Sequence, residues 1–153
     1  DVASLDKNNN ILIHGRNDDV INIRGHRVGS GEIEATILEI DEISEACAIP
    51  IEDPIEGSRV CVFCVSKKNN YKVKVKEKIN IKLNKFFGSF AIPKEVFFVN
   101  ALPKTRSGKI TRRLLRIMLN RSKENLGDMS TILDKKPILD IQKKINKYSL
   151  RLF

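Results

Sequence analysis

The sequence predicts an α+β fold: a small antiparallel sheet flanked by helices, with an N-terminal β-hairpin. Short strand-like apolar segments alternate irregularly with segments of helical spacing, and nothing indicates repeated βαβ units. The chain has 153 residues, of which 41% are hydrophobic, which is enough for one domain with a buried core. No run approaches the roughly 18 apolar residues that a membrane span requires, so we expect no membrane contact.

The first 40 residues are expected to form two strands and a helix. NNNILIHGRNDDVINIRGHRVG (residues 8–29) indicates two short strands joined by a polar turn at 16–19, and then a loop bracketed by glycines. Residues 30–40 are predicted to be helical, with Ser30 as a possible cap and with Glu32 and Glu34 near the positive end of the helix dipole. One face of this helix would carry three isoleucines: Ile33, Ile37 and Ile40.

The remaining elements follow from the same patterns. Strands are predicted at 43–51 and 59–67, separated by a turn that contains Pro54 and Gly57. The segment after them is ambiguous, because YKVKVK alternates like an exposed strand; its helical spacing favours a helix over 75–87 that ends at Gly88. The later elements are a strand at 94–100, a loop at 101–109, a helix at 110–119 and a terminal helix at 138–148.

The three cysteines indicate buried thiols. Cys61 and Cys64 have the spacing of a metal or redox pair, but they lie within a predicted strand, where residues three apart point to opposite faces. Cys47 adds no second pair, and the only histidines are His14 and His26. The odd count favours a reducing compartment, and we expect the cytoplasm, with the nucleus as an alternative.

Charge is distributed unevenly along the chain. Residues 1–66 carry 5 basic and 13 acidic side chains, whereas residues 67–153 carry 23 and 6. This asymmetry predicts either a polyanion near the second half or a lysine-rich solvated surface. A basic nucleic-acid-binding module is therefore one hypothesis, although two tyrosines and no tryptophan leave few side chains for base stacking.

Lys109 is the candidate for chemistry within ALPKTRSGKITRRLLRIML (residues 101–119). A phosphate-loop interpretation of Gly108 and Lys109 fails, because Pro103 and Ile110 stand where that motif needs Gly and Ser or Thr. A lysine on a loop before a helix is suited to reach a phosphoryl oxygen or a carboxylate. The residues alone leave open that Lys109 is an ordinary exposed lysine.

Three segments carry a family resemblance: GRNDDVINIRGHRVGSGEIEA (15–35), ALPKTRSGKITRRLLR (101–116) and NLGDMSTILD (125–134). In this order and spacing they resemble the C-terminal domain of AMP-forming acetyl-CoA synthetases, members of the adenylate-forming superfamily. IRGHRVG and NLGDMST are similar to its acetate and propionate branch. The resemblance covers essentially the whole chain.

The resemblance implies two half-reactions with acetate, ATP, coenzyme A and Mg²⁺. Acetate attacks the α-phosphate of ATP to give acetyl-AMP and pyrophosphate, and coenzyme A then attacks acetyl-AMP to release acetyl-CoA and AMP. Lys109 matches the lysine that contacts the carboxylate and the α-phosphate in the first step. The same lysine is reversibly acetylated in the family, which would remove its charge.

Further site residues are implied by the same resemblance. Asp18 matches the hinge about which the domain rotates between the two steps, and Arg16 and Arg27 match nucleotide contacts. Asp1 matches the aspartate that binds the ribose hydroxyls, which would put the start of this chain at the seam between two domains. We thus expect residues 1–17 to be the interdomain linker and first hairpin strand, and 18–153 to be the mobile C-terminal domain.

The coenzyme A and magnesium contacts are implied in the same way. Gly25 matches a glycine that lets pantetheine pass close to the backbone, but Arg24 replaces the serine common before it. Asn84 stands where bacterial members place an arginine near the 3′-phosphate; Arg24 and Lys85 could supply charge instead. The Mg²⁺ site would use three backbone carbonyls: those of Leu38, Ile40 and Ile43.

The partner implied by the resemblance is the N-terminal adenylation domain of the same polypeptide. The phosphate loop and the acetate pocket belong to that domain, so we expect the isolated chain to be inactive. Within the family, a propionyl-CoA or other short-chain acyl-CoA synthetase is the alternative, because the acyl pocket does not lie in this domain.

Overall fold

The computed structural model describes residues 2–15, 20–67, 72–120 and 129–149. Near the N-terminus, β1 (Val2–Leu5) pairs antiparallel with β2 (Ile11–Gly15), and β3 (Val20–Ile23) pairs antiparallel with β4 (His26–Gly29). An N-terminal strand pair is thus present, but the predicted partners are wrong: β2 and β3, expected to form a hairpin with each other, do not pair in the described sheets. Each instead pairs with a strand on its other side in the sequence.

The main sheet has the order β5–β6–β7. Strands β5 (Ile43–Asp53) and β6 (Gly57–Ser66) form a long antiparallel hairpin. Strand β7 (Glu95–Val99) pairs parallel with β6, which corrects the expectation of a purely antiparallel sheet. The chain between β6 and β7 contains the long helix α2 (Lys72–Phe87), and such a helical crossover is the connection that parallel neighbours require.

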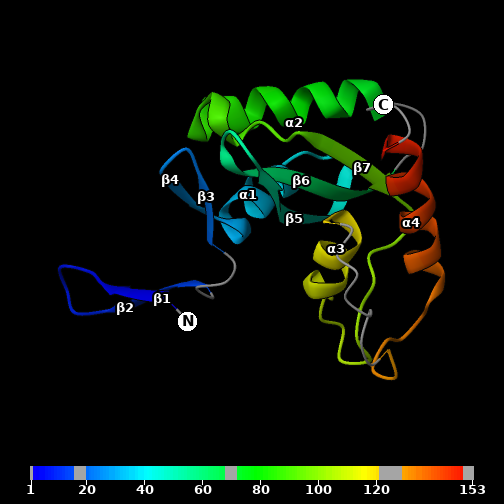
Figure 1. Cartoon of the computed structure of the whole chain (residues 1–153). Helices are drawn as coiled ribbons and strands as arrows, with labels where there is room; N and C mark the ends of the chain where they lie inside the picture. The colour runs from blue at the N-terminus through cyan, green and yellow to red at the C-terminus, as the bar shows by residue number, and fades with distance from the viewer. Residues whose placement is uncertain (1, 16–19, 68–71, 121–128, 150–153) are drawn as a thin grey trace.

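Helices cover both faces of this sheet (Figure 1). Helix α1 (Ser30–Leu38) and α2 pack with β3 on one face, while α3 (Arg112–Leu119) and α4 (Lys136–Ser149) pack on the other. A short 3-10 turn, η2 (Ser89–Ala91), follows α2. The α+β class with flanking helices is therefore confirmed. No helix in the described ranges is long and apolar enough to cross a membrane.

The two cores follow the period of two in the strands. Val60, Val62 and Cys64 of β6 contribute to the core under α1 and α2, whereas Cys61 and Phe63 contribute to the core under α3 and α4. The two cysteines three residues apart point to opposite faces, as the strand pattern predicts. Cys47 also lies in the second core, and all three thiols are buried.

The cap of α1 differs from the prediction. Gly29 rather than Ser30 is the N-cap, and the Glu32 carboxylate accepts a hydrogen bond of 2.8 Å from the Gly29 N–H. Ser30 is buried within the first turn. The interaction is the returning half of a capping box, in which the third residue of the helix satisfies the N-cap amide.

Glu34 ties α1 to the sheet and to α3. Its carboxylate accepts one hydrogen bond of 2.9 Å from the Ala48 N–H on β5 and another of 2.6 Å from the Arg112 guanidinium on α3. Glu34 is only 9% exposed. The prediction that Glu34 serves the helix dipole is therefore incomplete: the side chain joins three elements of the domain.

Burial of two thiols predicts a stability loss in alkali. Burial raises the pKa of Cys61 and Cys64 from 9.0 to about 12. Between these values the folded thiols keep protons that the unfolded chain loses, so stability is full below pH 9 and falls as pH rises toward 12. Each thiol should remove roughly 1 kcal/mol of unfolding free energy per pH unit in that window.

Urea unfolding at pH 8, 9 and 10 measures this slope. The Cys64→Ala variant is the comparison, because it removes one of the two thiols while all other titrating groups remain. We expect a smaller loss of unfolding free energy above pH 9 in the variant than in the unchanged chain. Equal slopes in the two proteins would contradict the assignment.

Candidate functional site

The Lys109 side chain is exposed at the end of a tight, internally bonded loop. Thr105 N–H donates to the Lys109 carbonyl at 2.9 Å, and Gly108 N–H donates to the Thr105 carbonyl at 2.9 Å. Gly108 has φ +82°, which glycine adopts without steric cost. An isolated antiparallel bridge between Lys104 and Ile110 closes the loop at its base. The backbone around Lys109 is therefore fixed while its ammonium reaches into solvent.

Side-chain hydroxyl groups form further hydrogen bonds that fix the Lys109 loop. Thr105 Oγ1 accepts a hydrogen bond of 3.2 Å from the Lys109 N–H and lies 2.9 Å from Ser107 Oγ. Below the loop, Thr111 Oγ1 donates to the Pro103 carbonyl at 3.1 Å. Thr105 is not among the site residues that the motifs predict; the signal that could have found it is its position four residues before Lys109.

A second segment, residues 129–133, braces the same loop. Arg106 N–H donates to the Thr131 carbonyl at 3.1 Å, and Leu133 N–H donates to the Lys104 carbonyl at 3.0 Å. A bridge pairs Thr105 with Ile132. These residues belong to the end of the NLGDMSTILD motif, so the structure joins two of the three motifs that carry the family resemblance. An open pocket lined by Thr105, Arg106, Ser107, Ser130 and Thr131 lies between them.

The remaining motif, residues 15–35, contains the β3–β4 hairpin, whose turn is Arg24–Gly25. Figure 1 shows this hairpin on one side of the domain and the loop before α3 on another. Arg27 is exposed on β4, opposite Asn22 in the register. Residues Asp1, Arg16 and Asp18 lie outside the described residues, and their predicted roles stay predictions. The domain therefore presents two separate candidate surfaces, one at Lys109 and one at Gly25.

Asn84 and Lys85 lie exposed near the C-terminal end of α2. A shallow pocket beside them is lined in part by Lys85, Ile40 and Phe86, so the structure brings the predicted coenzyme A and magnesium segments together. Phe86 is well exposed there. Asn84 itself does not line that pocket.

Several polar groups around the predicted magnesium segment already take part in contacts within the domain. The Ile40 carbonyl already accepts a hydrogen bond of 2.9 Å from the Ile43 N–H. The neighbouring carboxylates of Glu39 and Glu42 are paired with lysines of α2. Within the described part of the chain, no three His, Cys, Asp or Glu residues are grouped to hold a metal. The site at Leu38, Ile40 and Ile43 stays a prediction.

Several lysines of α2 form ion pairs with acidic residues of the same domain. Lys76 pairs with Glu95 at 2.6 Å, Lys82 pairs with Glu39 at 2.7 Å, and Lys78 pairs with Glu42. Lys104, before the Lys109 loop, pairs with Glu45 on β5 at 2.8 Å. These lysines therefore meet acidic residues of the first half of the chain or of β7, which accounts for part of the charge asymmetry without a polyanion.

Comparisons with known proteins identify the family of this chain. The family model described as AMP-binding enzyme C-terminal domain matches residues 32–109. An acetyl-coenzyme A synthetase of Penicillium chrysogenum is 42% identical over 134 residues, covering 88% of this chain and 20% of that protein. Acetyl-coenzyme A synthetase 1 of Saccharomyces cerevisiae is 40% identical over 140 residues, covering 86% and 20%. The chain thus spans about a fifth of the length of these curated relatives.

Solved structures give the same result. The crystal structure of a Brucella canis acyl-CoA synthetase is similar with a TM-score of 0.60 and 31% identity, over 74% of this chain and 21% of that chain. An ATP-bound MatB from Rhodopseudomonas palustris is similar with a TM-score of 0.66 and 25% identity, over 74% and 22%. These similarities do not favour the hypothesis of a nucleic-acid-binding module.

Proposed function

Because the chain belongs to the AMP-binding enzyme C-terminal domain family, we propose that it is the C-terminal lid domain of an AMP-forming acetyl-CoA synthetase. The observation that carries the proposal is the identity of about 40% to acetyl-CoA synthetases over nearly the whole chain. The proposed substrates are acetate, ATP and coenzyme A, and the proposed partner is the N-terminal adenylation domain of the same polypeptide. Mg²⁺, the proposed metal cofactor, would neutralise part of the negative charge of the ATP phosphates. The expected location is the cytoplasm.

In the first half-reaction, a carboxylate oxygen of acetate attacks the α-phosphorus of ATP, and the bond to pyrophosphate breaks. Negative charge is then shared between the acetate carboxylate and the α-phosphate oxygens. Lys109 would place its ammonium between them, where a preorganised charge stabilises the transition state. Its exposed side chain on a braced loop supports this role, because such a loop can enter a neighbouring domain without losing its shape.

In the second half-reaction, the coenzyme A thiolate attacks the acyl carbon of acetyl-AMP, and AMP leaves. We propose that the domain, residues 18–153, turns about Asp18 so that the Gly25 turn replaces Lys109 at the centre. The separation of the two surfaces in the fold supports such a rotation (Figure 1). Arg27, Arg16 and Asp1 are proposed nucleotide contacts, and Asn84 and Lys85 are proposed to face the coenzyme A phosphate. A hinge variant at Asp18 would keep pyrophosphate exchange and lose only thioester formation.

The proposal is tested by comparing the isolated chain with the full-length enzyme that carries it. The full-length enzyme is expected to convert acetate, ATP and coenzyme A into acetyl-CoA, AMP and pyrophosphate. The isolated chain is expected to form none, because it offers only one wall of the site. Acetate-dependent ATP–pyrophosphate exchange by the isolated chain would contradict this, and a preference for propionate over acetate in the full-length enzyme would favour the related short-chain activity.

A further inference from the structure

The β3–β4 turn contains an unusual backbone conformation. Ile23 and His26 are paired, which leaves Arg24 and Gly25 as the two central residues of a tight hairpin. Both have positive φ, +51° for Arg24 and +84° for Gly25. Such turns favour Asn-Gly or Gly-Gly, and a left-handed conformation costs a residue like arginine about 1–2 kcal/mol. Something outside the hairpin must therefore favour this conformation.

Glu56, in the turn between β5 and β6, contacts Arg24 twice. The Arg24 N–H donates to the Glu56 carbonyl at 3.2 Å, and the Arg24 guanidinium donates to Glu56 Oε1 at 2.5 Å. The other carboxylate oxygen, Oε2, lies 3.6 Å from Nε of Arg59. The Glu56 side chain is 15% exposed and that of Arg24 61%, so the shielded partner is the carboxylate. One residue thus holds both the backbone and the side chain of Arg24.

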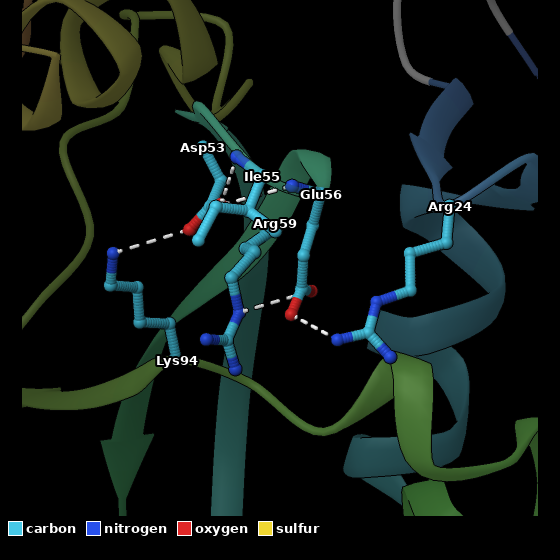
Figure 2. Close-up of polar contacts among 6 residues, drawn as sticks. All are labelled: Arg24, Asp53, Ile55, Glu56, Arg59 and Lys94. Carbon is cyan, nitrogen blue, oxygen red and sulfur yellow. Dashed lines mark hydrogen bonds and ion pairs between the residues drawn. The ribbon is translucent and has the colours of Figure 1, made fainter.

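The turn that carries Glu56 is itself fixed. Asp53 Oδ1 accepts hydrogen bonds from the N–H groups of Ile55 and Glu56, at 3.0 and 3.1 Å. Lys94 lies 3.6 Å from the other oxygen of Asp53. Figure 2 shows these contacts as one series from Lys94 through Asp53 and Glu56 to Arg24. The long β5–β6 hairpin is therefore a firm support for the β3–β4 turn.

Gly25 faces open space next to this support. A Cβ built on Gly25 would meet no atom within 4 Å. A ligand chain can therefore approach the backbone there, provided that the turn keeps its orientation. The contacts of Glu56 act on the neighbouring residue Arg24, the other central residue of the turn.

We propose that Glu56 is a positioning residue for the coenzyme A step: it holds the Arg24–Gly25 turn in the conformation in which the backbone of Gly25 faces the pantetheine chain. This rests on the proposed function of the Gly25 turn. Arg24, which departs from the serine common in the resembling family, is on this account a structural partner of Glu56. The contrasting role for Arg24 is a direct charge contact to coenzyme A, with Glu56 competing for its guanidinium. The two roles predict opposite changes in KM for coenzyme A when the Glu56 carboxylate is removed: a rise if Glu56 positions the turn, and a fall if Glu56 competes with coenzyme A for Arg24.

The experiment uses the full-length enzyme with Glu56→Gln, which keeps the size of the side chain and removes its charge. We expect KM for coenzyme A to rise about fivefold, the effect of losing one partly exposed ion pair. ATP–pyrophosphate exchange should stay unchanged, because adenylation does not use the Gly25 turn. Glu52→Gln is the matched control: it removes the same charge from exposed Glu52 on β5, four residues away, and should change neither parameter.

The Arg24→Gly background tests whether Glu56 acts through Arg24. Glycine adopts positive φ without cost, so Glu56→Gln should have no further effect on KM in that background. A lower KM in Glu56→Gln, a value equal to that of Glu52→Gln, or an equal loss of exchange and thioester formation would overturn the inference. Absence of acetyl-CoA formation by the unchanged full-length enzyme would instead refute the proposed function, so the two failures are distinguishable.

Discussion

Replacing Lys109 with Ala in the full-length enzyme is expected to lower acetate-dependent ATP–pyrophosphate exchange by about 10²–10³-fold. The expected effect is large because the ammonium would act on charge that develops in the transition state, in a site closed to water. Lys109 has no carboxylate partner in the described ranges, so its removal should leave the domain fold intact. The measurement is incorporation of labelled pyrophosphate into ATP at saturating acetate.

Arg106→Ala is the matched control for this change. Arg106 is exposed on the same loop, three residues before Lys109, and its removal lowers the net charge by the same amount. We expect exchange in this variant to stay close to that of the unchanged enzyme. Equal losses in the two variants would mean that the loop contributes only general positive charge.

Replacing Glu34 with Ala is expected to produce the largest loss of stability among these variants. The change leaves the buried N–H of Ala48 on edge strand β5 without its side-chain acceptor, and removes the carboxylate that pairs with Arg112. Breaking a largely buried pair of this kind costs about 3 kcal/mol, reduced here from the fully buried value because the Arg112 side chain is 31% exposed. The midpoint of thermal unfolding should fall by about 6–12 °C.

Glu39→Ala provides the comparison for Glu34. Glu39 follows α1 and pairs with Lys82 at 2.7 Å, but its side chain is 60% exposed. Its loss should cost no more than about 1 kcal/mol, since solvent screens an exposed pair. Similar midpoints for the two variants would show that the Glu34 contacts contribute little.

The sequence pattern predicted most of the fold because burial here follows simple periods. Cys61 and Cys64 fell on opposite faces of β6, and Val75, Ile79 and Leu83 are all buried on α2, as their spacing indicates. Which strands pair with each other was harder to predict, because strand pairing depends on contacts between residues distant in the sequence. The pairing of β1 with β2 and the parallel pairing of β6 with β7 therefore emerged only from the structure.

The sequence motifs predicted the candidate site residues, but they did not predict the residues that hold those site residues in place. Lys109 and Gly25 stand in recognisable sequence contexts, whereas Glu56 and Glu34 act through partners 32 and 78 residues away. A local signal did exist for Glu34, which lies one helical turn from buried Ser30 and Ile37. No comparable signal existed for Glu56, because its role depends on two turns that meet only in the folded domain.

The most direct test of the central claim supplies acetyl-AMP and coenzyme A to the Lys109→Ala enzyme and measures the rate of acetyl-CoA formation. If Lys109 serves adenylation alone and the domain then presents another surface, this rate should stay within about threefold of that of the unchanged enzyme. A loss as large as that of pyrophosphate exchange would contradict the account, since Lys109 would then be needed in both half-reactions or for the fold itself.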